Sequence, residues 1–286
     1  MAASPQLLID AGAAVGLPCS KLERPFLVNR SRPALGALFE VCLIGSDEEH
    51  LSSVADACLA ETLRLDRRLS RFSAQSETAR INREALRDAV VVDYELAELL
   101  TLCYSAWQRT EGWFDIAENQ SWSIRNQRVE FLEPGTQLDL NCVSKGYALD
   151  RAAELVDEFH VADALLHAGT QTVLAKGNSL TGRGWQIRIR NPSSDAQGSE
   201  LLLSLCDEAL AVISTRDRQS PAAKEAAVLA IAETAFEAEV FASALLNMGR
   251  ARAMEFLASH ARLAVAWLDE VTFPHEGTWH WLREPR

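Results

Sequence analysis

No run of 18 or more apolar residues occurs in the sequence, so no segment is long enough to span a membrane as a helix. The sequence also lacks any run of five or six basic residues. Its net charge is −12, from 28 Lys plus Arg against 40 Asp plus Glu. A surface of this charge repels the phosphates of nucleic acids and of anionic lipids. We therefore expect no nucleic-acid partner and no membrane span.

No two of the six cysteines form a CxxC pair, which argues against a zinc ribbon. Near the N-terminus no Lys or Arg precedes Lys21, and Asp10 interrupts the apolar patch, so the sequence does not favour a signal peptide or lipoprotein cleavage before Cys19. Four cysteines lie in apolar periodic runs and are expected to be buried: Cys42, Cys58, Cys103 and Cys206. Reduced, buried cysteines favour a cytoplasmic protein.

The short signatures of common enzyme classes are absent as well. The sequence has no GxGxxG after a predicted strand, no phosphate-binding GxxxxGK[ST], no HExxH and no GxSxG. Its six histidines are scattered, and none pairs with another at a spacing of three or four. The sequence therefore supports neither a histidine metal centre nor a Ser-His-Asp triad.

Helices and strands are mixed without a regular βαβ alternation, which favours the α+β class. Helices are predicted from apolar spacings of three and four at 48–70, 94–110, 145–159 and 237–260. Strands are predicted at 35–44, 164–166, 185–189, 201–205, 209–213, 264–268 and 279–282, with a hairpin joining 129–131 to 138–140 around the turn at 133–136. We expect residues 1–31 to be an N-terminal extension and residues 32–286 to form a single domain of largely antiparallel sheets packed with helices.

The segment from Leu138 to Ala153 is the first candidate for chemistry. A strand carrying Asp139 leads into a short loop, and a helix opens near Lys145 and Gly146. A helix N-terminus presents free backbone N–H groups, so a lysine placed there makes an anion site suited to a phosphate. Spacing alone favours the simpler alternative, in which Asp139 caps the helix and Lys145 is a solvated charge.

The second candidate is the pair Glu239 and Ser243 on the last predicted helix. Residues four apart share one face of a helix. A carboxylate beside a hydroxyl is a set of hard oxygen ligands that Mg²⁺ accepts. Again, spacing alone favours the alternative of a surface glutamate beside a helical serine.

Taken together, these segments resemble the ApbE family of flavin transferases, which attach the FMN part of FAD to a threonine of a protein. The similar segments follow the family's order over about residues 33–268. They are Leu35–Phe39, Leu69–Phe72 with Ser76, Glu77, Ile81 and Asn82, Thr110–Asp115, Leu138–Ala153, and Ala238–Leu245 with Gly249. The run Lys145-Gly146-Tyr147-Ala148 carries much of the likeness.

The resemblance implies the role of each matching residue. Positions that lie against FAD match Leu35, Phe72, Trp113, Phe114, Asp115, Asp139 and Lys145. The metal would be held by the backbone carbonyl of Cys142 and by the side chains of Glu239 and Ser243. Lys145 would stabilise phosphate charge and Asp139 would orient the substrate. The implied partners are FAD as substrate, Mg²⁺ as cofactor, and an acceptor protein with a threonine.

The chain departs from the family at four places. The metal pair is Glu239 and Ser243 where the family has Asp and Thr, and the stretch His167–Gln171 lacks a glycine and a carboxylate of the family's glycine-rich loop. The family's segment after residue 213 is matched only at Ser214–Arg218. The family segment HHIIDPRTG has no counterpart, because Gln219–Glu225 is too short to hold it. Two alternatives to transfer therefore remain open: a weak or inactive flavin-binding relative, and a Mg²⁺-dependent FAD hydrolase.

Overall fold

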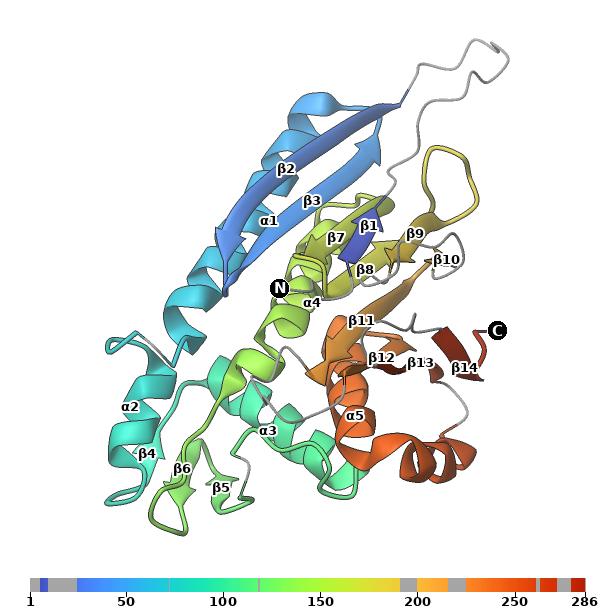
Figure 1. Ribbon diagram of the computed structural model, residues 1–286. Coiled ribbons are helices and arrows are strands. Elements are labelled where there is room, and N and C mark those ends of the chain that lie inside the picture. The colour runs from blue at the N-terminus through green and yellow to red at the C-terminus, as the bar shows by residue number, and fades with distance from the viewer. Residues whose placement is uncertain are drawn as a thin grey trace.

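An eight-stranded sheet organises the molecule (Figure 1). The computed structural model describes residues 6–9, 25–71, 73–117, 119–190, 200–215, 225–260, 263–271 and 279–285. The sheet has the order β14-β13-β12-β11-β8-β7-β3-β2, and all neighbours are antiparallel. Its strands are β2 (Phe26–Ala34), β3 (Ala37–Gly45), β7 (Asp163–Ala168), β8 (Thr172–Lys176), β11 (Glu208–Ser214), β12 (Glu225–Ala232), β13 (Ala264–Val271) and β14 (Trp279–Arg283).

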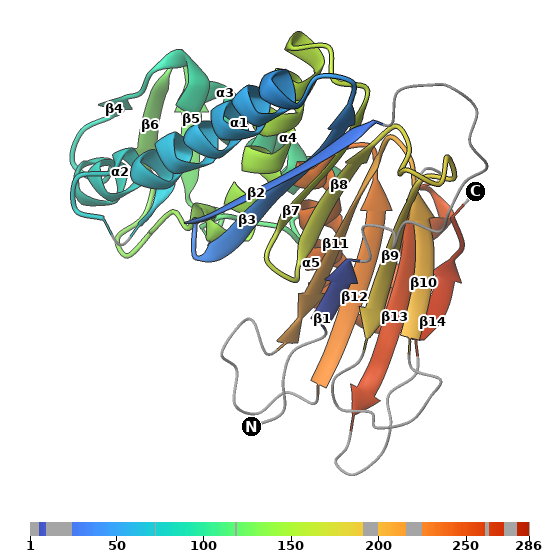
Figure 2. The ribbon, with the colours of Figure 1, turned by 90° about the horizontal axis from the view of Figure 1, so that it is seen from above.

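Both faces of this sheet are covered (Figure 2). Helices α1 (Glu48–Leu69), α4 (Ser144–Glu158) and α5 (Ala235–Ala258) lie on one face. A three-stranded antiparallel sheet of β1 (Gln6–Ile9), β9 (Trp185–Arg190) and β10 (Glu200–Leu205) lies on the other. Successive side chains of a strand point to opposite faces. In β3, Phe39, Val41 and Leu43 therefore join the core on the helix side, while Cys42 and Ile44 join the core between the sheets.

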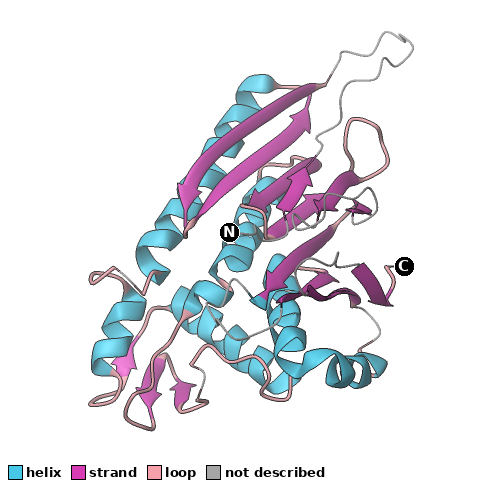
Figure 3. Ribbon diagram, in the orientation of Figure 1, coloured by secondary structure: helices cyan, strands magenta, loops and turns pink. Residues whose placement is uncertain are grey.

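A smaller unit lies beside the helices (Figure 3). It contains α2 (Glu77–Glu84), α3 (Tyr94–Arg109) and a second three-stranded antiparallel sheet of β4 (Val90–Val91), β6 (Arg128–Phe131) and β5 (Trp122–Arg125). The α+β class with largely antiparallel sheets is confirmed. Within the parts of the chain that the structure describes, no helix has the length and apolar character needed to cross a membrane.

The predicted helices are confirmed within one or two residues at each end, and β3, β7, β11, β13 and β14 of the main sheet lie where strands were predicted. Helix α2 and the strands β1, β2, β4, β5, β8 and β12 were missed. The expected N-terminal extension of 1–31 contains β1, and β2 crosses its boundary. The last predicted helix is interrupted at Gly249, whose φ of 72° and ψ of 161° are not helical.

The predicted hairpin between 129–131 and 138–140 is wrong. Strand β6 pairs with the preceding β5 through a turn at Asn126 and Gln127, where φ is 48° and 60°. The segment at 138–140 leads instead into a 3₁₀ turn, η1 (Leu140–Cys142).

The expected burial of four cysteines holds for Cys42, Cys58 and Cys103, whereas Cys206 is exposed because it lies just beyond the end of β10. Cys19 lies outside the described residues.

Candidate functional site

The N-terminus of α4 has no cap from its own side chains. Val143 occupies the N-cap position and makes no side-chain hydrogen bond. The first N–H groups of a helix have no partner within the helix, so they need one from elsewhere. The N–H of Gly146, in the first turn, donates to the Oε2 atom of Glu239 on α5 at 2.9 Å. The acid predicted for the metal site therefore contacts the segment predicted for the anion site.

Glu239 is almost fully buried, with 1 % of its surface exposed. Its other carboxylate oxygen, Oε1, accepts a hydrogen bond from the hydroxyl of Thr172 on β8 at 2.6 Å. Burial raises the pKa of Glu239, and the positive charge of Lys145 and the two hydrogen bonds act in the opposite direction. A buried carboxylate of this kind is stabilised by any additional positive charge brought close to it.

A glycine is required at position 146 by the close packing of α4 on α5. A Cβ atom added there would lie 2.5 Å from the carbonyl oxygen of Ala235 and 2.9 Å from Oε2 of Glu239. Both distances are far below normal contact. The absence of a side chain at Gly146 thus lets the Glu239 carboxylate reach the backbone of α4.

Ser243 lies one helical turn beyond Glu239 and is also buried, while Cys142 at the end of η1 is half-buried. Helix α5 packs against both η1 and α4. A carboxylate, a hydroxyl and a backbone carbonyl are the types of oxygen ligand that Mg²⁺ accepts, together with water and phosphate. Over the described ranges, no cluster of three or more His, Cys, Asp or Glu side chains offers a rival metal site.

Asp139 is held in place at the entrance to α4. Its carboxylate accepts the N–H of Asn141 at 3.0 Å and forms an ion pair with Arg71 at 3.0 Å. The backbone N–H of Asp139 donates to the carbonyl of Ile116 at 2.7 Å. Asp139 therefore connects its own segment to that of Arg71, and to Ile116, which directly follows the segment Thr110–Asp115.

Asn82 also holds this segment in place, through the backbone of Leu138. Its side-chain amide accepts the N–H of Leu138 at 2.8 Å and donates to the carbonyl of Leu138 at 3.0 Å. This pairing resembles a strand neighbour and explains why 138–140 does not need a partner strand. Asn82 lies in α2, which Ser76 caps by accepting the N–H of Ala79 at 3.0 Å.

The aromatic segment near residue 114 differs from its predicted role in one respect. Phe114 is 1 % exposed and belongs to the core, whereas Trp113 is 39 % exposed. The carboxylate of Asp115 accepts N–H groups of Ala117 at 3.0 Å and Gln120 at 2.7 Å, and the indole of Trp122 at 3.3 Å. Asp115 therefore shapes its own loop in this structure.

Leu35 lies in the turn between β2 and β3 with a φ of 48°, a left-handed conformation that is rare for a leucine. The N–H of Gly169 donates to the carbonyl of Leu38 at 2.8 Å, so the turn between β7 and β8 lies against this hairpin. Phe72, also predicted to contact FAD, lies outside the described residues.

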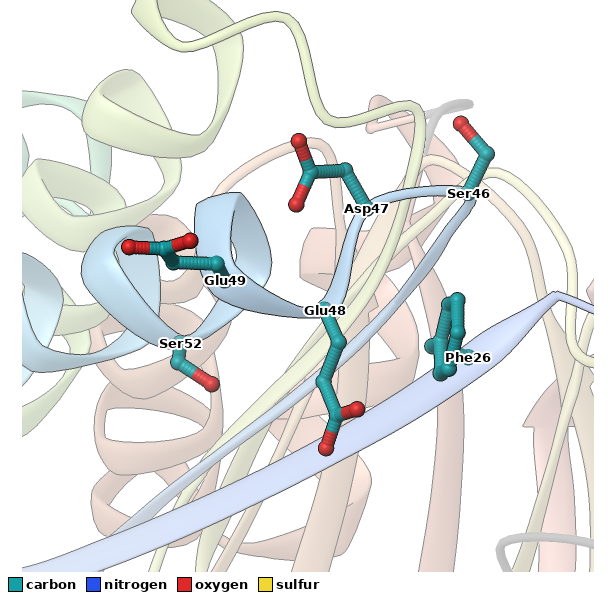
Figure 4. A pocket seen from close by; sticks show the side chains of 6 residues that line it. All are labelled: Phe26, Ser46, Asp47, Glu48, Glu49 and Ser52. Atoms are coloured by element: carbon teal, nitrogen blue, oxygen red, sulfur yellow. The ribbon is translucent and has the colours of Figure 1, made fainter.

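A large surface depression of about 630 Å³ is lined by six residues near the N-terminus of α1: Phe26, Ser46, Asp47, Glu48, Glu49 and Ser52 (Figure 4). Asp47 caps α1 by accepting the N–H of His50 at 3.0 Å. Three carboxylates in one depression repel a phosphate. None of the predicted site residues lies there, so we do not assign the site to it.

Two contributors to the site were missed by sequence reasoning. No sequence pattern indicated a role for Thr172, because it lies in a strand that was not predicted. Asp150 stands in the same helical segment as Lys145, which is a weak indication of a role in the site, but nothing in its spacing linked it to α5. In the structure it accepts two backbone N–H groups of α5.

The fold is that of solved flavin transferases. The structure is similar to the flavin transferase ApbE from Vibrio cholerae (TM-score 0.77, 16 % identity, covering 90 % of this chain and 97 % of that one). It is also similar to the flavinyl transferase ApbE of Pseudomonas stutzeri (TM-score 0.78, 18 % identity, 92 % and 96 % covered). A third is the ApbE protein of Thermotoga maritima (TM-score 0.73, 20 % identity, 85 % and 94 % covered).

The sequence itself matches the model of the ApbE family at residues 35–128 and 118–267, and the chain belongs to this family. A protein of Klebsiella pneumoniae strain 342 named FAD:protein FMN transferase is 22 % identical over 275 aligned residues, covering 77 % of this chain and 78 % of that protein. A Haemophilus influenzae protein of the same name is 28 % identical over 64 residues, which cover 22 % of this chain and 18 % of that protein.

Proposed function

We propose that this protein is a Mg²⁺-dependent FAD:protein FMN transferase, which moves FMN from FAD to a threonine of an acceptor protein and releases AMP. The observation that carries the proposal is the contact between Glu239 and the backbone N–H of Gly146. It unites the acid of α5 with the N-terminus of α4, beside Lys145. The family membership and the names of the relatives support the same activity.

The anionic part of FAD would bind at the N-terminus of α4. Lys145 and the positive end of the helix dipole attract phosphate there. Glu239, Ser243 and the carbonyl of Cys142 would hold Mg²⁺, which supplies charge neutralisation to the pyrophosphate when bound. Asp139, fixed by Arg71, would orient the substrate, and the exposed ring of Trp113 would stack on it. We also propose a cytoplasmic location, from the reduced cysteines that the sequence favours.

A second candidate is a flavin-binding protein without transfer activity. One observation favours it: both oxygens of Glu239 already accept hydrogen bonds from the protein. These donors compete with a cation for the same carboxylate.

The test is incubation of the purified protein with FAD and Mg²⁺, with and without an acceptor protein carrying a threonine site. AMP release that requires the acceptor, with flavin bound covalently to it, supports transfer. AMP and FMN released without an acceptor indicate hydrolysis, and bound but intact FAD indicates the flavin-binding candidate. Either of these last two results overturns the proposed transfer.

Two variants locate the activity. Glu239→Gln removes the charge of the buried acid and should abolish AMP release. Glu255→Gln makes the same change on an exposed part of α5, where Glu255 pairs with Arg252 at 2.7 Å, and should leave release unchanged. Equal activity in both variants would remove Glu239 from the site.

A further inference from the structure

Helices α4 and α5 cap one another. On α5, the N–H groups of Ala235 and Phe236 donate to Oδ1 and Oδ2 of Asp150 at 2.8 and 2.9 Å. On α4, the N–H of Gly146 donates to Glu239. Asp150 belongs to α4 and Glu239 belongs to α5, so each helix supplies the carboxylate that satisfies the first turn of the other.

The two caps lie at matching positions. Asp150 stands four residues after Gly146, and Glu239 stands four residues after Ala235, which is about one turn in each helix. Gly146 also lies directly against the carbonyl of Ala235, where no Cβ atom fits. Sliding of one helix along the other would therefore break the hydrogen bonds of both carboxylates.

We propose that Asp150 is a positioning residue for the candidate site: by clamping the first turn of α5 to α4, its carboxylate holds the Glu239 carboxylate against the N-terminus of α4. Asp150 acts on substrate only through Glu239. The functional part of this inference rests on the proposed transferase activity. The structural part, which concerns the coupling of two helix ends, does not.

The surroundings of Asp150 disfavour its ionised form. Burial of its carboxyl group is the main cause that raises the pKa of Asp150 to about 7, and the charges of Glu239 and Glu154 add to the rise, while the N–H bonds from Phe236 and Ala235 oppose it. Asp150 lines a pocket of about 240 Å³ whose charged walls are Glu154 and Asp157 on α4, Lys176 on β8, Asp207 and Glu208 at the start of β11, and Glu233 before α5. Lys176 pairs with Asp157 at 2.5 Å. Of the carboxylates that line this pocket, Glu154 is the one whose charge raises the pKa of Asp150.

Hydrogen exchange of the full-length protein, measured by mass spectrometry at one fixed pH, tests the coupling. The variant is Asp150→Asn, which keeps the shape but can accept only one of the two N–H groups. The matched control is Thr234→Ala, which removes the cap that α5 has of its own, the 3.1 Å bond from the N–H of Glu237. Both variants weaken the start of α5, but only the first removes a link to α4.

We expect Asp150→Asn to speed exchange about tenfold, as for the loss of one charged hydrogen bond, in the first turns of both α5 and α4. Thr234→Ala should speed exchange in α5 alone. The inference is overturned if Asp150→Asn also affects α5 alone, because Asp150 would then be a local cap. If Asp150→Asn does not fold, as judged by circular dichroism, Asp150→Glu is measured with the same two outcomes.

Turnover separates this inference from the proposed function. If the wild-type protein transfers FMN, the Mg²⁺ concentration for half-maximal AMP release should rise about tenfold in Asp150→Asn and stay unchanged in Thr234→Ala. Equal Mg²⁺ dependence in all three proteins would overturn the positioning role. If the wild-type protein transfers no FMN, the proposed function fails, and the exchange experiment still decides whether Asp150 couples the two helices.

Discussion

The hydroxyl of Thr172 donates to Glu239 across 2.6 Å and so ties the sheet to the acid of α5. With the N–H of Gly146, it is one of the two donors to a carboxylate that is 1 % exposed. The acid is thus held from two directions, by a strand and by a helix end. Burying a carboxylate lowers the stability of a protein unless the carboxylate is hydrogen-bonded. Removing either donor should therefore lower the free energy of unfolding measurably.

Replacing Thr172 by Val keeps the shape of the side chain and removes the hydroxyl. We expect the free energy of unfolding to fall by about 1–3 kcal/mol, because one oxygen of Glu239 loses its partner. Urea unfolding measures the change. Thr172→Ser should restore most of the stability, and Thr170→Val, the same change at an exposed position two residues away, should have little effect. Equal losses at 170 and 172 would argue against a role for the hydroxyl.

Gly146→Ala tests the close approach of α4 and α5. The added methyl group meets the backbone carbonyl of Ala235, which cannot move away as a flexible side chain would. We expect the free energy of unfolding to fall by about 1–3 kcal/mol, which is typical of overpacking. If the protein turns over FAD, the Mg²⁺ concentration for half-maximal AMP release should rise. Gly45→Ala is the control, since its methyl group would meet only the side chain of Leu51, at 3.2 Å. A thermal melt that ranks Gly45→Ala as the more damaging variant would contradict this explanation.

Lys145→Ala should weaken FAD binding by about tenfold or more, because a charged hydrogen bond contributes ~1.5–3 kcal/mol. Quenching of flavin fluorescence during titration measures the affinity. Lys176→Ala removes a lysine of β8 that pairs with Asp157 and should not change the affinity. An unchanged affinity in Lys145→Ala would remove this lysine from the anion site.

The pH dependence of stability should differ between the wild type and Asp150→Asn. The pKa of Asp150 rises from 3.8 to about 7 on folding, with burial as the main cause. Between about pH 4 and pH 7 the folded state keeps a proton that the unfolded state has released, so the contribution of Asp150 to stability falls as the pH rises. The advantage of the wild type over Asp150→Asn should therefore be greatest near pH 4 and shrink towards pH 7.5.

Thermal unfolding at a series of pH values measures this difference. Glu158→Gln, the same carboxylate-to-amide change at an exposed position two turns further along α4, serves as the control and should follow the wild type in parallel. A difference between the wild type and Asp150→Asn that stays constant with pH would show that Asp150 does not titrate in this range.

Helices α1 and α3 could be predicted because each buries a single face, which leaves a three-and-four spacing in the sequence. The missed strands β8 and β12 belong to a sheet that is covered on both faces, so their sequences TVLAK and EAAVLAIA show no alternation of apolar and polar residues. The false hairpin followed the turn signal Pro134-Gly135. The actual turn, at Asn126 and Gln127, contains no glycine, and nothing local shows that a side chain, Asn82, occupies the place of a partner strand.

The candidate site was predictable only in part. The spacing of Glu239 and Ser243 places them on one face of α5, and the helix start near Lys145 follows from the pattern around it. Their approach to one another is set by packing between helices that are far apart in the sequence. The hydrogen bonds of Thr172 and Asp150 depend on this packing, so no local pattern contains them.

Strand β2 forms one edge of the eight-stranded sheet, and its outer side is a place where another molecule could pair with the sheet. An unpaired edge is a template for the strand of another chain, and this one is nine residues long with Phe26 and Leu27 exposed. Pro33 removes one N–H from the strand, and Arg30 and Arg32 add charge along it. Residues of these types are gatekeepers against edge-to-edge aggregation, so this strand carries protection in its own sequence.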